Sequence, residues 1–193
     1  HTLKDLLEFL KLYSKRGKIF ILGSGSNILF KDNTYEGVVI KLGKSFSNIS
    51  ILNKDMIVAG AAVTQKKLSE FAKDNNLSGM EFLSCIPGSV GGGIRMNSGC
   101  FGNEFKDVLA SIQIIGFDGT VKTIPANRIN FKYRNTDLPK EIIFLSATFK
   151  GSKGNCIEIE KYMNQLKIKK EKTQPSKIKT GGSTFKNPED EID

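Results

Sequence analysis

GMEFLSCIPGSVGGGIRMNSGCFG, residues 79–102, is the most informative segment of this chain. It is rich in glycine, and Glu81 and Arg95 are its only ionisable side chains apart from two cysteines. It is too apolar for a solvated linker and too rich in glycine for an ordinary helix or strand. Because glycine permits positive φ and close backbone approach, two interpretations stay open. The backbone N–H groups of residues 88–93, ahead of a short helix or turn, hold a phosphate, or the glycines form a tightly packed buried turn.

A second glycine-rich turn follows a short apolar run at residues 18–22, which predicts a buried strand. The turn reads Gly23-Ser24-Gly25-Ser26-Asn27, and a strand feeding such a turn can cradle a diphosphate. The third glycine and the long helix of the Rossmann fingerprint are missing, and so is the Gly-Lys-Ser/Thr of a P-loop. Gly-Ser turns after strands are common, so this turn alone does not decide the function.

Composition and charge narrow the class of protein. The chain has 193 residues, enough for one large domain or two small ones. Its net charge of +9 favours anionic partners. No apolar run approaches the roughly 18 residues that cross a bilayer, so we expect no membrane partner. Cys85, Cys100 and Cys156 show no C-x-x-C spacing, so we expect reduced cytoplasmic thiols and no metal site.

Hydrophobic periodicity predicts a mixture of helices and strands. Helices are predicted from a capped start at Thr2 to a stop at Gly17, after an N-cap at Thr64, and over residues 157–172. Strands are predicted at residues 36–42, 56–62, 111–117, 120–124 and 144–149, with Asp118-Gly119 as the turn of a hairpin. The polar residues 45–54 mark a possible domain boundary.

Two further motifs carry polar groups near glycine or aromatic residues. Residues 130–136 read either as a surface loop or as Tyr133 and Arg134 held side by side to bind an anion, since the arginine fork bonds carboxylate or phosphate bidentately. In residues 180–188, two glycines place Ser183 on a turn, with Lys186 and Asn187 close behind. The only histidine is terminal, so Ser183 is no triad nucleophile, but an oriented hydroxyl can donate a proton.

The predicted helix at residues 157–172 is strongly basic. From Lys150 to Lys179 there are nine lysines against three glutamates. A solvated helix face explains most of this charge. A nucleic-acid surface is the alternative, but the interleaved aromatic residues that stack on bases are absent, so we expect no nucleic-acid partner.

Four blocks in order, at residues 22–27, 79–102, 131–136 and 181–188, resemble the UDP-N-acetylenolpyruvoylglucosamine reductase family. The short span from Arg134 to Ser183 resembles its type II branch. The resemblance implies an α+β fold: a two-subdomain FAD-binding module of the vanillyl-alcohol-oxidase-like kind, plus the start of a third, substrate-binding domain. The implied limits are 1–43 for an incomplete first subdomain, 44–172 for the second and 173–193 for the substrate domain.

The resemblance also implies the chemistry. FAD, reduced by NADPH, would reduce the enolpyruvyl group of UDP-N-acetylglucosamine enolpyruvate to a D-lactyl ether, in peptidoglycan synthesis, in a cytoplasmic monomer. Arg134 would be catalytic with Tyr133 as its substrate-side neighbour, Ser183 would donate the proton, and Lys186 and Asn187 would contact substrate. The implied cofactor-binding residues are Gly23, Ser24, Gly25, Ser26, Asn27, Pro87, Gly88, Ser89, Gly92, Gly93, Asn97 and Gly99.

The sequence departs from the family in several places. The strands that precede Thr2 in the family, and a catalytic glutamate beyond Pro188, have no counterpart here, so we expect a fragment that binds FAD weakly. Gly93 and Ser98 stand where alanine is usual. Two alternatives stay open: another FAD-dependent oxidoreductase of the same fold, or a non-enzymatic protein that binds nucleotides or nucleic acid through the basic helix.

Overall fold

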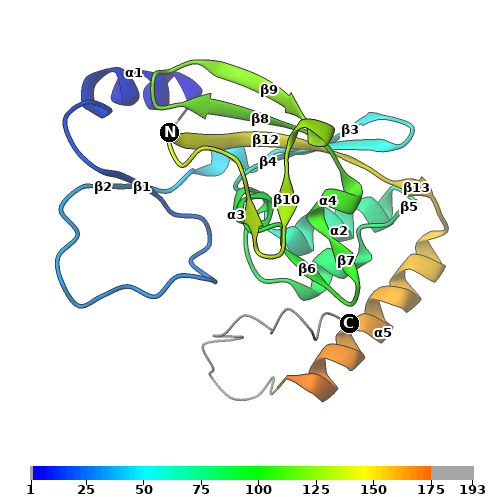
Figure 1. Cartoon of the computed structure of the whole chain (residues 1–193). Coiled ribbons are helices and arrows are strands. Elements are labelled where there is room, and N and C mark those ends of the chain that lie inside the picture. Colours follow the sequence, from blue (N-terminus) through cyan, green and yellow to red (C-terminus); the bar gives the residue numbers. More distant parts are fainter. Residues whose placement is uncertain (1, 175–193) are drawn as a thin grey trace.

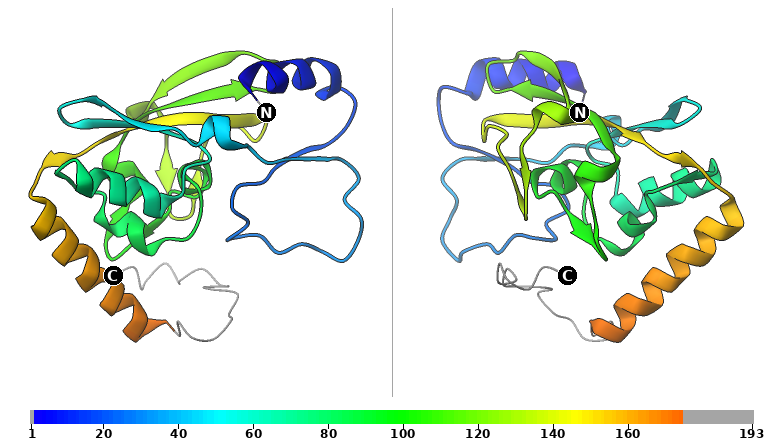
Figure 2. Two further views of the ribbon diagram at one scale, coloured as in Figure 1. Left: turned by 180° about the vertical axis from the view of Figure 1, so that it is seen from behind. Right: turned by 45° about the vertical axis from the view of Figure 1, so that its right-hand side comes forward.

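A five-stranded antiparallel sheet forms the centre of the molecule, in a computed structural model that describes residues 2–174 (Figure 1). Its strand order is β3-β4-β12-β8-β9, with bounds Ile49–Asn53, Met56–Gly60, Ile142–Lys150, Leu109–Gly116 and Val121–Pro125. Helices cover both faces of the sheet, as the view from behind also shows (Figure 2). The α+β class predicted from the sequence is confirmed.

Helix α1, Leu3–Tyr13, covers one face of the sheet. Its predicted start is confirmed, because Thr2 and Asp5 form a capping box in which each side chain accepts a bond from the other's backbone N–H. Leu6 and Leu10 pack with Ile143 and other residues of the sheet. Strands β1, Ile19–Ile21, and β2, Val38–Ile40, follow and pair in parallel beside this cluster.

The polar residues 45–54 contain regular structure. A 3-10 turn, η1, covers Lys44–Phe46, and β3 forms an edge of the main sheet. The sequence did not predict strand β3, because β3 is mostly exposed on both faces and therefore lacks the alternation of apolar and polar residues that marks a half-buried strand.

Residues 79–102 contain a short helix, as one interpretation of the glycine turn allowed, but this helix already begins within residues 88–93. After the 3-10 turn η2, Glu81–Cys85, helix α3 runs over Val90–Arg95 with Ser89 as its N-cap. A side chain on Gly93 would meet the Phe105 ring at 2.3 Å, so this glycine is required by packing. The short strands β6, Gly99–Cys100, and β7, Asn103–Glu104, and helix α4, Phe105–Val108, complete this region.

The predicted hairpin between β8 and β9 is confirmed. Gly119 has φ +84°, and the Asp118 carboxylate accepts bonds from the backbone and hydroxyl of Thr120 at 2.9 Å each. After the 3-10 turn η3, Ala126–Arg128, a second and tighter hairpin pairs β10, Phe131–Lys132, with β11, Asn135–Thr136.

Strand β12 confirms the strand predicted at residues 144–149, but its buried positions do not alternate regularly along its length. Ile142 and Phe144 face the large core, and after an irregularity in the pairing with β8 the same face is taken by Ala147 and Phe149. One extra residue therefore lies between the two pairs, as in a β-bulge, and the parity of the buried positions changes there.

The remaining helices form the layer on the opposite face from α1. Helix α2, Gln65–Asp74, is capped by Thr64 as predicted. Short strands β5, Leu77–Ser78, and β13, Ser152–Lys153, pair before helix α5, Cys156–Thr173, which packs along η2 and α2. Ile159 and Leu166 of α5 are buried, whereas Tyr162, which lies between them at helical spacing, is exposed.

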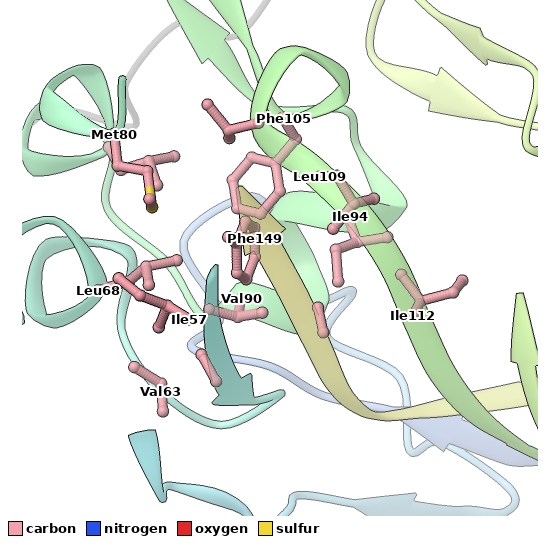
Figure 3. Close-up of a cluster of buried hydrophobic side chains, with 14 of the residues drawn as sticks. Ile57, Val63, Leu68, Met80, Val90, Ile94, Phe105, Leu109, Ile112 and Phe149 are labelled. Carbon is pink, nitrogen blue, oxygen red and sulfur yellow. The ribbon is translucent and has the colours of Figure 1, made fainter. Parts of the chain in front are cut away.

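A large core fills the space between this layer and the sheet (Figure 3). Phe105 and Phe149 meet edge to face with ring centroids 5.8 Å apart, and Ile94 of α3 is fully buried beside them. The glycine-rich helix is thus part of the core on one side, which leaves its other side free to line a site. No described helix is long and apolar enough to span a bilayer.

Candidate cofactor cleft

A cleft of about 1240 Å³ lies between the two glycine-rich turns, the β10–β11 hairpin and the C-terminal end of α5. Drug-sized ligands occupy pockets of roughly 300–1,000 Å³, so this cleft is large enough for a dinucleotide. All five residues of the first turn, Gly23–Asn27, line it. From the second segment the lining residues predicted from the sequence are Pro87, Gly88, Ser89, Gly92, Asn97 and Gly99.

The two glycine turns, some 60 residues apart in sequence, are tied together. The Ser26 hydroxyl donates to the carbonyl oxygen of Pro87 at 3.1 Å. A Cβ on Gly23 would lie 2.7 Å from Ser89 Oγ, so the backbones approach closely there. Gly88 has φ +135°, a conformation that only glycine adopts readily. Both turns therefore need glycine for their conformation or for their mutual approach.

The first turn offers unused hydrogen-bond donors. Among residues 2–174, no protein acceptor receives a bond from the backbone N–H groups of residues 23–28. In the second turn the N–H of Gly92 is already held by Ser89 Oγ at 3.3 Å. Free, convergent N–H groups bind phosphate oxygens well, so the first turn is the better phosphate ligand of the two.

The second turn is anchored from behind by the loop between β4 and α2. Val90 N–H donates to Val63 at 2.8 Å, and Gly91 N–H to Ala61 at 2.9 Å. Gln65 N–H donates back to Gly88 at 3.0 Å. These bonds hold the turn rigidly, which preorganises it for a ligand.

Gln65 is the buried polar residue that sequence reasoning missed at this site. Its side chain is 1% exposed and lines the base of the cleft, where Nε2 donates to the Ser89 carbonyl at 3.5 Å. Its Oε1 has no hydrogen-bond partner within the described residues. Turning the amide over would set Oε1 against the Ser89 carbonyl oxygen, so this orientation is the better one.

Asn97 supports the far end of the second segment. It is 2% exposed, with φ +41°, and its side chain donates to Glu104 at 3.0 Å and accepts from Lys106 N–H at 3.1 Å. Gly99 lies against Asn103, whose carbonyl oxygen would be 2.4 Å from an added Cβ. Gly93, also predicted to bind cofactor, does not line the cleft and packs on Phe105 and Gln65 instead.

Tyr133 and Arg134 form the tip of the tight β10–β11 hairpin and line the cleft. Arg134 has φ +50°, and its guanidinium carbon lies 5.8 Å from the centroid of the Tyr133 ring. A non-glycine residue in this strained region is uncommon and clusters at functional sites. The structure therefore brings the two side chains together at the site, as the second interpretation of residues 130–136 requires.

The cleft is positively charged. Six lining side chains are cationic and two are anionic; the cations are Lys41, Arg95, Lys106, Arg134, Lys140 and Lys170. Lys106 is paired with Glu104 at 2.6 Å. At the end of α5, Lys170 donates to the Cys85 carbonyl oxygen, and Lys169 lies 4.8 Å from the centroid of the Phe101 ring. An anionic ligand is expected in such a cleft.

Two cysteines, Cys85 and Cys100, also line the cleft. Burial, with a smaller contribution from Cys85, raises the pKa of the Cys100 thiol to about 12. Its Sγ donates to the Phe82 carbonyl at 3.3 Å. Cys100 is therefore a packing residue held as the thiol, in keeping with the preference of cysteine for buried positions.

Some site residues could not be found from sequence, and some lie outside the described residues. Ser183, Lys186 and Asn187 belong to the latter group. Lys140, Ile142 and Phe144 reach the cleft only because β12 pairs beside β4 and β8. Arg95 did carry a signal: it is the one cation in an apolar, glycine-rich segment.

Comparison with known proteins finds a family match over residues 1–125, to the family described as "FAD binding domain". The UDP-N-acetylenolpyruvoylglucosamine reductase of Pelagibacter ubique is 59% identical over 192 residues, covering 100% of this chain and 64% of that protein. The chain thus spans less than two thirds of the length of this relative.

Solved structures agree on the fold. The crystal structure of UDP-N-acetylenolpyruvylglucosamine reductase (MurB) from Thermus caldophilus matches with a TM-score of 0.81 at 28% identity, covering 97% of this chain and 66% of that one. CO dehydrogenase from Oligotropha carboxidovorans matches with a TM-score of 0.57 at 16% identity, over 78% of this chain and 57% of that one, a likeness of fold alone.

Proposed function

The chain belongs to the FAD binding domain family, and from this premise we propose that it acts in the reduction of UDP-N-acetylglucosamine enolpyruvate to UDP-N-acetylmuramate during peptidoglycan synthesis. The observation that carries this proposal is the meeting, in one cleft, of two tied glycine turns with a strained Tyr133-Arg134 hairpin. The likeness to reductases of this name, at 59% identity for one of them, supports it.

FAD fits the residues of the cleft. The free N–H groups of Gly23–Asn27 and the glycine positions that a Cβ would fill suit its diphosphate. The excess of cationic side chains offsets the diphosphate charge. When bound, the flavin supplies hydride transfer, with NADPH as the proposed reductant, and the protein supplies position and charge.

Arg134 is the proposed electrostatic catalyst. Addition of a hydride to the enolpyruvyl β-carbon leaves negative charge on the α-carbon and the adjacent carboxylate. The hairpin fixes the backbone of Arg134 and the Tyr133 ring supports its guanidinium, so the cation would stabilise this charge with little reorganisation. Tyr133 lies under that guanidinium and would orient it from the substrate side.

The remaining roles follow from the likeness of sequence. Ser183 would protonate the α-carbon, and Lys186 and Asn187 would hold the substrate. Residues 1–43 and 44–172 would be the two FAD-binding subdomains, and 173–193 the start of the substrate domain. We also propose a cytoplasmic monomer. Lys169 and Lys170 of α5 contact residues of the cleft. These contacts favour a role for α5 in forming the wall of the cofactor cleft over a role in nucleic-acid binding.

The test is the substitution Arg134→Gln in the full chain, followed by rapid mixing. We expect the reoxidation of reduced flavin by enolpyruvyl-UDP-N-acetylglucosamine to slow about 10²–10³-fold, as for loss of other preorganised charge-stabilising donors. FAD affinity and reduction by NADPH should stay unchanged, and the matched control Arg128→Gln, on an exposed turn outside the cleft, should behave as wild type. An equal slowing of both half-reactions in R134Q would contradict the proposed role.

A further inference from the structure

Arg95 is held firmly at the wall of the cleft. Its Nη1 donates to the Leu138 carbonyl oxygen at 2.9 Å, and its guanidinium carbon lies 5.0 Å from the centroid of the Phe144 ring. Its own carbonyl oxygen accepts from Thr136 Oγ1 at 3.4 Å. Backbone and side chain are both fixed, so the guanidinium cannot turn away to a distant partner.

No described carboxylate neutralises the charge of Arg95. Within residues 2–174, no aspartate or glutamate forms an ion pair with it. The side chain is half-buried and lines the cleft, and the Leu138 carbonyl uses only one of its five N–H donors. A partly buried cation is costly unless an anion approaches it. The remaining donors therefore suit an anionic group of the ligand.

The position of Arg95 separates it from the diphosphate-binding turns. It is the last residue of α3, whose six residues span about 9 Å from the turn at Ser89. The bond from Thr136 ties it to the hairpin that carries Arg134. Phe144 and Ile142, two residues apart on β12, add an apolar surface on the same side. Arg95 is thus at the end of the cleft that suits the isoalloxazine ring.

We propose that Arg95 is the electrostatic partner of the reduced flavin ring. A bound flavin that accepted a hydride, which is two electrons and one proton, from NADPH would gain one negative charge on its ring, while the nicotinamide would be oxidised. The fixed guanidinium of Arg95 would then bind the reduced ring more tightly than the oxidised ring. Arg95 thereby raises the reduction potential. This inference rests on the proposed FAD chemistry, and not on which substrate is reduced.

The test compares wild type, Arg95→Gln and Arg128→Gln, each as the FAD-bound full chain. The reduction potential is measured by equilibration with a reference dye, and the Kd for oxidised FAD by quenching of flavin fluorescence. In R95Q we expect the ratio of reduced to oxidised affinity to fall at least tenfold, which is about 30 mV for a two-electron couple. The Kd for oxidised FAD should change less than about threefold, and R128Q should match wild type.

Arg95→Lys separates charge from packing. It keeps the cation but loses the fork, so its potential should stay closer to wild type than that of R95Q. A potential in R95Q equal to that of wild type overturns the inference. So does equal weakening, or loss, of oxidised FAD binding, because Arg95 would then be a general anchor. A wild-type chain that binds no flavin even with FAD in excess contradicts the FAD assignment itself, a failure distinct from the other two.

Discussion

Gly93 shows how one residue can serve packing where the sequence predicted ligand binding. A Cβ there would meet two ring atoms of Phe105 at 2.3 and 2.4 Å, and Phe105 is fully buried against Phe149. Gly93→Ala would gain up to about 1 kcal/mol in helix propensity but cause overpacking that costs about 1–3 kcal/mol. We expect a net loss of unfolding free energy in urea titrations.

The controls for Gly93→Ala lie in the same helix and in its partner ring. A Cβ on Gly92 would meet only Ser89 Oγ, at 3.4 Å, so Gly92→Ala should not lower stability. In a Phe105→Leu background, Gly93→Ala should cost less than in wild type, because the clashing ring is gone. The same cost in both backgrounds would refute the packing explanation.

Gln65 provides a second prediction, in which a substitution is expected to raise the stability of the chain. Its unpartnered Oε1 is buried, and an unsatisfied buried acceptor costs about 1–3 kcal/mol. Gln65→Met keeps the volume and removes that acceptor, so thermal unfolding of the FAD-free chain should move to higher temperature. A lower melting temperature would mean that the bond from Nε2 to Ser89 outweighs the orphaned oxygen.

The Cys100 thiol should be protected and should link stability to alkaline pH. Because burial raises its pKa to about 12 from an ordinary value of 9.0, the unfolded chain loses this proton first. The contribution of the protonated Cys100 thiol to the free energy of unfolding is therefore fully present below pH 9, and it falls as the pH rises from 9 toward 12. In a Cys85→Ser, Cys156→Ser background, native Cys100 should react with iodoacetamide at pH 8.5 far more slowly than the urea-unfolded chain. Equal rates would show that the thiol is accessible and ionised.

At the scale of elements, the β8–β9 hairpin carries an acid-sensitive turn. Two hydrogen bonds from Thr120, first from its N–H and then from its hydroxyl, lower the pKa of Asp118 below 3.8. Its stabilising contribution is present above pH 3.8 and is lost as pH falls through the lowered pKa. Asp118→Asn should remove this part of the acid dependence, as measured by urea unfolding between pH 5 and 2. An unchanged profile in D118N would assign that dependence to other carboxylates.

The same hairpin is an example of an element that can be predicted from a few neighbouring residues in the sequence. Asp118-Gly119 gives the turn, and the capping box at Thr2 gives the start of α1, because both signals act within a few residues. Strand β3 pairs with β4, the next strand in sequence, but it is mostly exposed on both faces and so shows no alternating apolar pattern. The break in the alternation of β12 lies in its pairing with β8, a strand far away in sequence, so no local pattern reveals it. Helix α3 begins within the glycine run, which helix propensity does not predict, because its glycines are selected by Phe105 and Ala61, which lie elsewhere in the sequence.

At the scale of the whole molecule, the cleft is a product of the tertiary fold. The sequence predicted a phosphate-binding role for each glycine turn as one of two interpretations. The contact between the turns through Ser26 and Pro87 needs the sheet and α3 to bring them together. Gln65 and Lys140 join the site from elements with no motif of their own. Periodicity and composition did not predict that these residues meet in one cleft. The prediction came from the family resemblance, which rests on the order of the four sequence blocks.

The most direct test is the visible absorption spectrum of the full chain after incubation with FAD and desalting. We expect a retained flavin spectrum that bleaches with NADPH and recovers on addition of enolpyruvyl-UDP-N-acetylglucosamine, but not of UDP-N-acetylglucosamine. A spectrum that bleaches and does not recover would contradict the proposed substrate while leaving the cofactor cleft intact. A chain that shows no bound flavin even with FAD in excess would contradict the cleft as an FAD site.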